Sequence, residues 1–415
     1  MKMTVGNEKT AGSVYAEHVT GAATEEFLPL VHEFDRMHRD GSDSDAELCV
    51  YVDGEERLLL RSRGQRPDRL QNIRSVSKAL LSVIVHALHE RGVVDIGRPM
   101  AEIWPQFAAG GKESLTPATF LSHQAGLIGV DRRLSVDDVL DWYPAVEALA
   151  AQRPYWEPGT EHGYHDLTFG WGIGEYLRRA TGKTVDELFG EEFRKPLGAD
   201  VHIGIGSEEF ARFVPFRETA SGTGGTGTGA GTAAEIIHLL GDRSSLLSRS
   251  QMNPNLLNAE RTLRYLGAEI PGCNAVSTAG PLARILAATL GPVNGVRLWN
   301  EDTLRRATRL QRRGTDRVFA RERAYAQGFM LPDRYLPQAG PDVESFGHYG
   351  QDCALVFAVP RHRLAFAYTS TQLNHRLDQY TKTDDRSGRL GRLAVESVRG
   401  RTPGDTGTGT GTPNR

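Results

Sequence analysis

The stretch Arg74-Ser75-Val76-Ser77-Lys78 leads directly into Ala79-Leu80-Leu81-Ser82-Val83-Ile84-Val85-His86-Ala87-Leu88, the most apolar helical segment of the chain. Ser75 and Lys78 stand three residues apart, so on an α-helix they lie on the same face. A serine at a helix start also lies near unpaired backbone N–H groups, which favour developing negative charge. This Ser-x-x-Lys occurs once in the sequence. It is either a nucleophile with its base or a capping serine followed by a lysine by chance.

The composition is that of an ordinary globular protein, with 415 residues, 39% hydrophobic, 24% charged and a net charge of −3. No basic excess points to nucleic acid, and no apolar run has the length needed to span a membrane. The N-terminus lacks the apolar core of a signal peptide, which predicts a cytoplasmic location. The scattered Cys49, Cys273 and Cys353 argue against a disulfide framework or structural zinc. No cofactor or metal is expected, and the oligomeric state is left open.

The alternation of apolar residues predicts strands near both ends of the chain, and the region between them is mainly helical. Asp53-Gly54 is a strong hairpin signal between the first two strands. This order predicts an α+β fold, with an antiparallel sheet formed from both termini and a mainly helical lobe inserted in it. The expected strands are 48–52, 57–61, 328–331, 345–348, 354–359 and 364–369, and the expected helices include 24–37, 75–90, 135–151, 168–180, 184–193, 279–290 and 389–398.

One domain is expected over residues 24–399, with the chemistry in the cleft between its two lobes. Disorder is expected where the composition cannot form a core. The α/β lobe is 24–70 plus 317–399, the helical lobe is 71–316, and the segments expected to be disordered or flexible are 1–23, the Gly/Thr-rich 220–232 and the tail 400–415.

Tyr164 lies in a dense polar cluster that follows a Pro/Gly turn and enters a helix. It could serve as a phenolate, which requires a nearby ammonium to lower its pKa from about 10, or as a proton relay. A buried tyrosine that satisfies loop carbonyls explains it equally well. His162 and His165 suggest either a metal site or local hydrogen bonding. No Glu-containing zinc pattern accompanies them, which favours hydrogen bonding.

A third stretch, Gly347-His348-Tyr349-Gly350-Gln351, stands at the end of an expected strand. Glycines at a strand end leave backbone N–H groups able to bind a developing oxyanion, a contact worth on the order of 3 kcal/mol per donor. His348 either orients the substrate and assists proton transfer or is structural.

Together these motifs resemble those of the serine β-lactamase and penicillin-binding-protein superfamily: Ser75-x-x-Lys78, then Tyr164-His165-Asp166, then His348-Tyr349-Gly350, in this order. The sequence is most similar to the class C β-lactamase-like branch, which contains class VIII carboxylesterases and transacylases. The likeness covers about residues 25–399, and residues 121–127, 156–160 and 196–200 support it.

The resemblance implies a β-lactamase/transpeptidase-like fold and a covalent mechanism acting on an ester or amide of a small molecule. Ser75 forms an acyl-enzyme, and Lys78, kept neutral by its apolar surroundings and Tyr164, accepts the serine proton. Tyr164 protonates the leaving group and activates the acyl acceptor. The backbone N–H groups of Ser75 and Gln351 form the oxyanion hole.

Departures from the family pattern bear on the substrate. The β-lactamases carry Lys-Thr-Gly where this chain has His348-Tyr349-Gly350. The missing ammonium weakens recognition of a substrate carboxylate and disfavours β-lactam hydrolysis. Asp166 stands in place of an asparagine and adds an acidic acceptor that affects the charge of Lys78. Tyr349 and Gln351, with the following Asp352 and Cys353, narrow and polarise the acyl pocket, which favours a particular polar substrate.

Three functions follow from these motifs. A carboxylesterase resolves the acyl-enzyme with water, and this is the preferred interpretation. A transacylase of secondary metabolism passes the acyl group to an amine or alcohol. A binding protein that has lost turnover is the weakest alternative, because Ser75, Lys78 and Tyr164 are all present.

Overall fold

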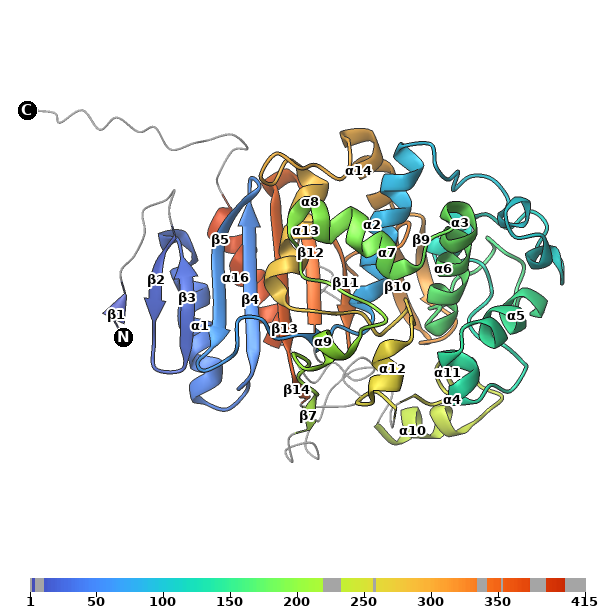
Figure 1. The fold of residues 1–415 in the computed structure, drawn as a ribbon, viewed down its shortest axis with the longest axis horizontal. Coiled ribbons are helices and arrows are strands. Elements are labelled where there is room, and N and C mark those ends of the chain that lie inside the picture. The colour runs from blue at the N-terminus through green and yellow to red at the C-terminus, as the bar shows by residue number, and fades with distance from the viewer. Residues whose placement is uncertain are drawn as a thin grey trace, which may run out of the picture.

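The protein is built on an eight-stranded antiparallel sheet in which strands from the two ends of the chain meet where β4 pairs with β13 (Figure 1). The computed structural model describes residues 2–3, 11–218, 233–256, 259–333, 342–351, 354–373 and 386–399. The strand order is β1-β2-β3-β5-β4-β13-β12-β11. The bounds are β1 (Lys2–Met3), β2 (Gly12–Tyr15), β3 (Val19–Ala23), β4 (Ala46–Val52), β5 (Glu55–Ser62), β11 (Phe346–Gly350), β12 (Ala354–Val359) and β13 (Leu364–Ser370).

The predicted hairpin is present between β4 and β5, where Asp53 and Gly54 both have positive φ, 53° and 79°. Such a turn matches the twist of the paired strands. Two expectations need correction. The segment expected to be disordered up to residue 23 contains β2 and β3, and β3 pairs with β5. No strand forms over 328–331, where Met330 makes only isolated bridges to Tyr325 and Gly347. The segments 220–232 and 400–415 lie outside the described residues.

Helices cover both faces of the sheet (Figure 1). α1 (Leu28–Arg39) and α16 (Arg386–Val398) lie on one face, and α13 (Ala279–Leu290) packs on the other. Alternate residues of β4 point to opposite faces of the sheet, and because both faces are covered, every residue of β4 is buried. Leu48 and Val50 enter the core under α1 and α16. Cys49 and Tyr51 enter the larger core that contains α2 (Val76–Glu90) and α13.

The region between β6 (Gln71–Asn72) and β9 (Arg312–Asp316) is mainly helical, as predicted. The helix expected over 135–151 is broken at Trp142, whose φ is 67°. The helix expected over 184–193 forms as α7 (Val185–Phe189) and continues as one π turn, η4 (Gly190–Arg194). The helix expected from residue 24 begins with a 3-10 turn, η1 (Glu25–Phe27). The remaining elements are α3 (Pro117–Leu121), α4 (Val136–Leu140), α5 (Tyr143–Ala151), α6 (Leu167–Thr181), α8 (Lys195–Leu197), α9 (Ser207–Phe210), β7 (Arg217–Glu218), α10 (Ala233–Gly241), α11 (Leu246–Gln251), α12 (Leu263–Gly267), β8 (Val276–Ser277), α14 (Glu301–Thr308), β10 (Arg321–Tyr325) and β14 (Gln372–Leu373).

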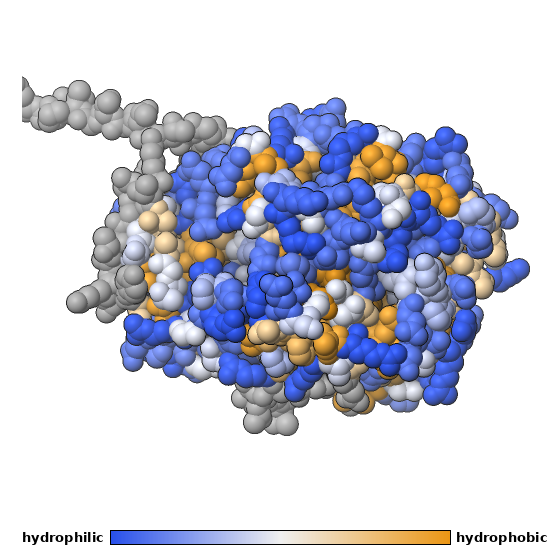
Figure 2. Space-filling view, viewed as in Figure 1, coloured by the Kyte–Doolittle hydropathy of each residue, from blue (hydrophilic) through white to orange (hydrophobic). Residues whose placement is uncertain are grey.

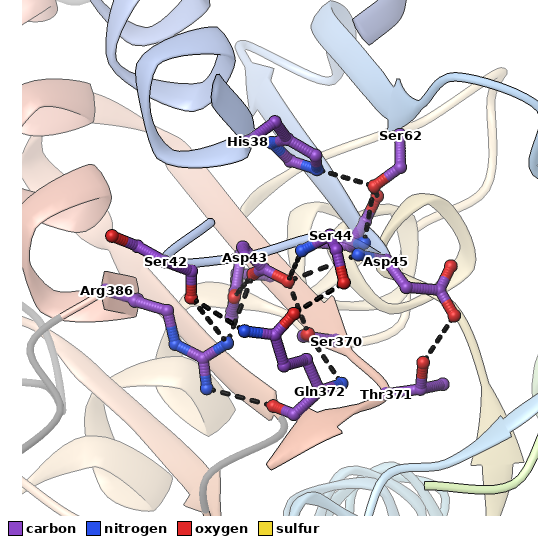
Figure 3. Close-up of polar contacts among 12 residues, drawn as sticks. His38, Ser42, Asp43, Ser44, Asp45, Ser62, Ser370, Thr371, Gln372 and Arg386 are labelled. Carbon is purple, nitrogen blue, oxygen red and sulfur yellow. Dashed lines mark hydrogen bonds and ion pairs between the residues drawn. The ribbon is translucent and has the colours of Figure 1, made fainter. Parts of the chain in front are cut away.

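A buried polar network joins the start of β4 to the end of β13 (Figure 3). The Asp43 carboxylate is fully buried and accepts hydrogen bonds from the hydroxyls of Tyr368 and Ser370, the latter at 2.9 Å. Arg386, at the start of α16, lies 3.4 Å from the same carboxylate. Thr371 donates to Asp45 beside it. Because a buried carboxylate is costly without such partners, the network fixes the two ends of the chain against each other.

The surface carries no extended apolar region on the face seen in Figure 2, which is mainly hydrophilic with scattered apolar patches. Within the described ranges, every helix is too short or too polar to cross a bilayer.

Candidate active site

Ser75 follows a strained turn at the start of α2. Arg74 has a positive φ of 48°, a conformation that side chains other than glycine rarely adopt. Its N–H donates to Asn72 Oδ1 at 2.6 Å, and its guanidinium pairs with both oxygens of Glu260 at 2.8 and 3.0 Å. The Phe216 ring lies 4.7 Å from the same guanidinium. These contacts hold the turn in place and present Ser75 at the helix start.

Lys78 lies one turn into α2, and its side chain is fully buried. Its Nζ lies 3.2 Å from Ser75 Oγ, 3.1 Å from Asp166 Oδ1 and 2.7 Å from the Gly272 carbonyl oxygen. Three acceptors match the three protons of an ammonium, and one of the three is a carboxylate. The geometry therefore favours a charged Lys78 in the resting site, in contrast to the neutral lysine expected from the family mechanism.

Close backbone packing brings Gly272 to this position. A Cβ on Gly272 would lie 2.8 Å from the Asp166 carbonyl oxygen, and a Cβ on Gly170 would lie 2.2 Å from Gly272 N. Only glycine allows the two segments to approach so closely. The start of α6, which follows Asp166, is thereby fixed against the loop that supplies a carbonyl acceptor to Lys78.

Tyr164 reaches the same centre from the loop before α6. Its ring lies 4.9 Å from Lys78 Nζ, and its hydroxyl shares a hydrogen bond with Ser75. Burial raises the pKa of Tyr164 well above its usual value, the Asp166 carboxylate raises it further, and the bond to Ser75 opposes both. This direction is opposite to the lowered pKa that a phenolate base requires. Tyr164 is therefore a neutral hydroxyl at neutral pH, suited to relaying a proton.

The Tyr164 loop is held by two buried histidines. His123 Nδ1 accepts the N–H of His165 at 3.0 Å, and the His123 ring lies 5.0 Å from the Tyr164 ring. His165 Nε2 accepts the N–H of Leu127 at 3.1 Å, and its Nδ1 lies 2.7 Å from the Gly163 carbonyl oxygen. Both ring nitrogens of His165 therefore make hydrogen bonds to nearby backbone groups, which supports local hydrogen bonding over a metal site for this histidine. No cluster suited to a metal ion occurs among the described His, Cys, Asp and Glu residues.

The end of β11 lies against the Ser75 turn. A Cβ on Gly350 would lie 2.4 Å from the Ile73 carbonyl oxygen, so this approach requires glycine. The Gln351 side chain accepts from Arg74 at 3.5 Å. His348 is buried, its Nδ1 lies 2.8 Å from the Tyr349 carbonyl oxygen, and burial lowers its pKa to about 3. A neutral His348 therefore does not replace the ammonium of the β-lactamase motif.

A small pocket opens beside Ser75, with about 270 Å³ of space that is partly open to solvent. The sequence predicted four of its lining residues, and Phe319, Arg323 and Met330 were missed. Phe319 and Arg323 lie in the β9–β10 hairpin, whose charged strands resemble a loop in sequence, and Met330 was expected only as part of a strand over 328–331. The lining residues are Ser75, Tyr164, Phe319, Arg323, Met330, Tyr349 and Gln351.

Comparison with known proteins agrees with this geometry. The family model described as Beta-lactamase matches residues 34–388. The chain belongs to the β-lactamase family. It is 31% identical over 371 residues to the esterase/beta-lactamase LipL of Mycobacterium tuberculosis, covering 86% of this chain and 83% of LipL.

Two solved structures of this family superpose over nearly their whole length. A family VIII carboxylesterase has a TM-score of 0.80 at 28% identity, with 92% of this chain and 100% of that chain covered. EstA from Arthrobacter nitroguajacolicus Rue61a has a TM-score of 0.77 at 28% identity, with 95% and 99% covered. The fold is accordingly the β-lactamase/transpeptidase-like α+β fold, and the protein is a serine hydrolase of the β-lactamase superfamily.

Proposed function

We propose that the protein is a carboxylesterase that hydrolyses an ester of a small molecule through an acyl-enzyme on Ser75. The observation that carries this proposal is the convergence beside Ser75 of Lys78, whose Nζ lies 3.2 Å from Ser75 Oγ, and of Tyr164, whose ring lies 4.9 Å from the same Nζ and which lines the Ser75 pocket. A serine hydroxyl becomes a competent nucleophile when positioned groups take its proton and stabilise its developing charge.

In the acylation step, Ser75 Oγ attacks the ester carbonyl carbon while its proton passes to the Tyr164 oxygen. Tyr164 gives its own proton to the leaving alkoxide as the C–O bond breaks, so the tyrosine stays neutral overall. This fits the raised pKa of Tyr164, which disfavours a free phenolate. The Lys78 ammonium, held by Asp166, stabilises the negative charge that develops on Oγ.

The carbonyl oxygen of the tetrahedral intermediate is bound, in this proposal, by the backbone N–H groups of Ser75 and Gln351. The close approach of Gly350 to Ile73 supports this assignment, because it brings the end of β11 beside the nucleophile. Deacylation reverses the relay: water attacks the acyl carbon, Tyr164 takes the water proton, and its own proton returns to Ser75 Oγ.

The test is covalent labelling of Ser75. A fluorophosphonate should add once per chain, with the adduct on Ser75 by mass spectrometry, and 4-nitrophenyl acetate should be turned over. Ser75→Ala should abolish both and leave the melting temperature nearly unchanged, because an alanine at this helix start removes little packing. Ser244→Ala, at an exposed serine, is the matched control. Equal turnover by Ser75→Ala and the wild type would refute the mechanism.

The same acyl-enzyme serves a transacylase if an amine or alcohol replaces water. Adding a primary amine or alcohol during turnover and measuring the ratio of transfer product to free acid separates the two. If the ratio of transfer product to free acid rises in proportion to the acceptor concentration and never saturates, the acceptor has no binding site and the protein is an esterase. A saturating acceptor that outcompetes water would assign the protein as a transacylase.

A further inference from the structure

Arg323 brings a buried positive charge to the wall of the Ser75 pocket. It lies on β10, pairs across the hairpin with Gly314 of β9, and its side chain is 2% exposed. Arg323 nonetheless lines the same pocket as Ser75 and Tyr164. Burying an arginine is costly unless its charge and its N–H groups find partners.

The guanidinium has few partners of its own among the described residues. Nη1 donates to the Glu322 carbonyl oxygen at 3.2 Å, and the Phe319 ring lies 5.3 Å from the guanidinium carbon. Nε is buried and makes no hydrogen bond within the described chain. An arginine has five N–H donors, so the single bond from Nη1 to Glu322 leaves most donors of Arg323 without a hydrogen-bond acceptor among the described residues.

The neighbouring carboxylates do not use these donors. Asp333 Oδ1 lies 3.7 Å from Nη1, which is an ion pair at a distance too long for a hydrogen bond. Asp316 is fully buried and already accepts from the Tyr325 hydroxyl at 2.9 Å and from two backbone N–H groups, of Val318 and Phe319, at 2.8 and 2.9 Å. The hydrogen bonds of Asp316 are therefore made within its own hairpin, while the Arg323 charge lowers the pKa of this carboxyl against the larger effect of burial.

We propose that the ester substrate carries an anionic group, most simply a carboxylate, that binds the Arg323 guanidinium beside Ser75. This inference rests on the proposed esterase function and adds a substrate class to it. A guanidinium presents parallel N–H groups that match the two oxygens of a carboxylate. Because Ser75 and Arg323 line one small pocket, the ester and the anion would belong to the same small molecule. Arg323 thus supplies, from another strand, the cation that His348 does not.

Two pairs of substrates test the proposal, each pair differing only in charge. Monomethyl adipate and methyl adipamate place a carboxylate or an amide on the acyl side. 4-Acetoxybenzoate and 4-acetoxybenzamide place them on the leaving-group side. In at least one pair, kcat/KM for the acid should exceed that for the amide by about 10- to 100-fold, the range expected of a charge-assisted contact. The pair that responds identifies the side that faces Arg323.

Arg323→Gln should remove this preference and change kcat/KM for the amides by less than about threefold, and Arg323→Lys should keep part of it. The matched control is Arg313→Gln, an exposed arginine of β9 that pairs with Glu322 in the same hairpin and should keep the preference. If Arg323→Gln does not fold, the wild-type comparison and Arg323→Lys still decide.

Acids and amides hydrolysed within about threefold of each other by the wild type, in both pairs, would overturn the inference. So would a folded Arg323→Gln that keeps the preference for acids. Neither outcome touches the esterase proposal, which is judged separately by turnover of neutral 4-nitrophenyl acetate and its loss in Ser75→Ala.

Discussion

Replacing Tyr164 by phenylalanine removes one hydroxyl from the site and little else. The ring keeps its neighbours, with Phe319 at 5.4 Å and His123 at 5.0 Å between ring centroids. The only described polar contact of the hydroxyl is with Ser75, so the free energy of unfolding should change by about 1 kcal/mol. A lost proton relay should lower kcat by about 10²- to 10⁴-fold, or about 3 to 5 kcal/mol of transition-state stabilisation.

The assay is steady-state hydrolysis of 4-nitrophenyl acetate, with chemical denaturation of the same preparations. Tyr155→Phe is the matched control, because Tyr155 is a half-buried tyrosine whose hydroxyl donates to Asp131 at 2.9 Å, outside the pocket. The control should lose similar stability and keep its kcat. A kcat for Tyr164→Phe within about threefold of the wild type would refute the relay and leave Lys78 as the only proton acceptor.

Three further results are expected. Asp166→Asn leaves the buried Lys78 ammonium without its counter-charge and should lower the free energy of unfolding, measured by urea titration, by about 1 to 3 kcal/mol. The expected loss is smaller than for a fully buried pair because the Asp166 side chain is 22% exposed. An unchanged free energy of unfolding would mean that Lys78 is neutral. Asp43→Ala should cost about 3 to 5 kcal/mol by the same measurement, since Arg386 and two hydroxyls lose their buried partner. Burial lowers the pKa of His165 and of His348 to about 3, so below pH 6.5 the unfolded chain binds more protons than the folded protein. As the pH falls from 6 to 4, the free energy of unfolding should therefore fall by about 1.4 kcal/mol per pH unit for each histidine. A free energy of unfolding that stays constant over this range would contradict their burial.

The sequence predicted those features that depend on local pattern. The hairpin at Asp53-Gly54 and the strands β12 and β13 follow from alternation and turn residues, and they form where expected. Ser75 and Lys78 meet because three residues nearly complete a helical turn. The break at Trp142 was not predicted, because the apolar spacing continues through it while only the backbone angle changes.

Other features depend on tertiary packing and have no sequence signature. The Gly272 acceptor of Lys78 is a backbone carbonyl, which every residue type carries. Arg323 is a charged residue in a charged strand, and nothing in its neighbourhood indicates that it is buried in a pocket. The raised pKa of Tyr164 follows from complete burial, whereas the motif suggests only the nearby ammonium and so gives the opposite direction.

The pairing of β4 with β13 also determines when the enzyme becomes active during its synthesis. As the chain leaves the ribosome, β4 can pair with β5 on one side, but its other edge stays unpaired until β13, which is much later in the chain, has been translated. The Ser75 turn emerges early, whereas Tyr349 and Gln351, which complete the pocket, follow much later. The proposed nucleophile is therefore made long before its pocket is complete, and a nascent or truncated chain that ends before β11 carries Ser75 without Tyr349 and Gln351 beside it.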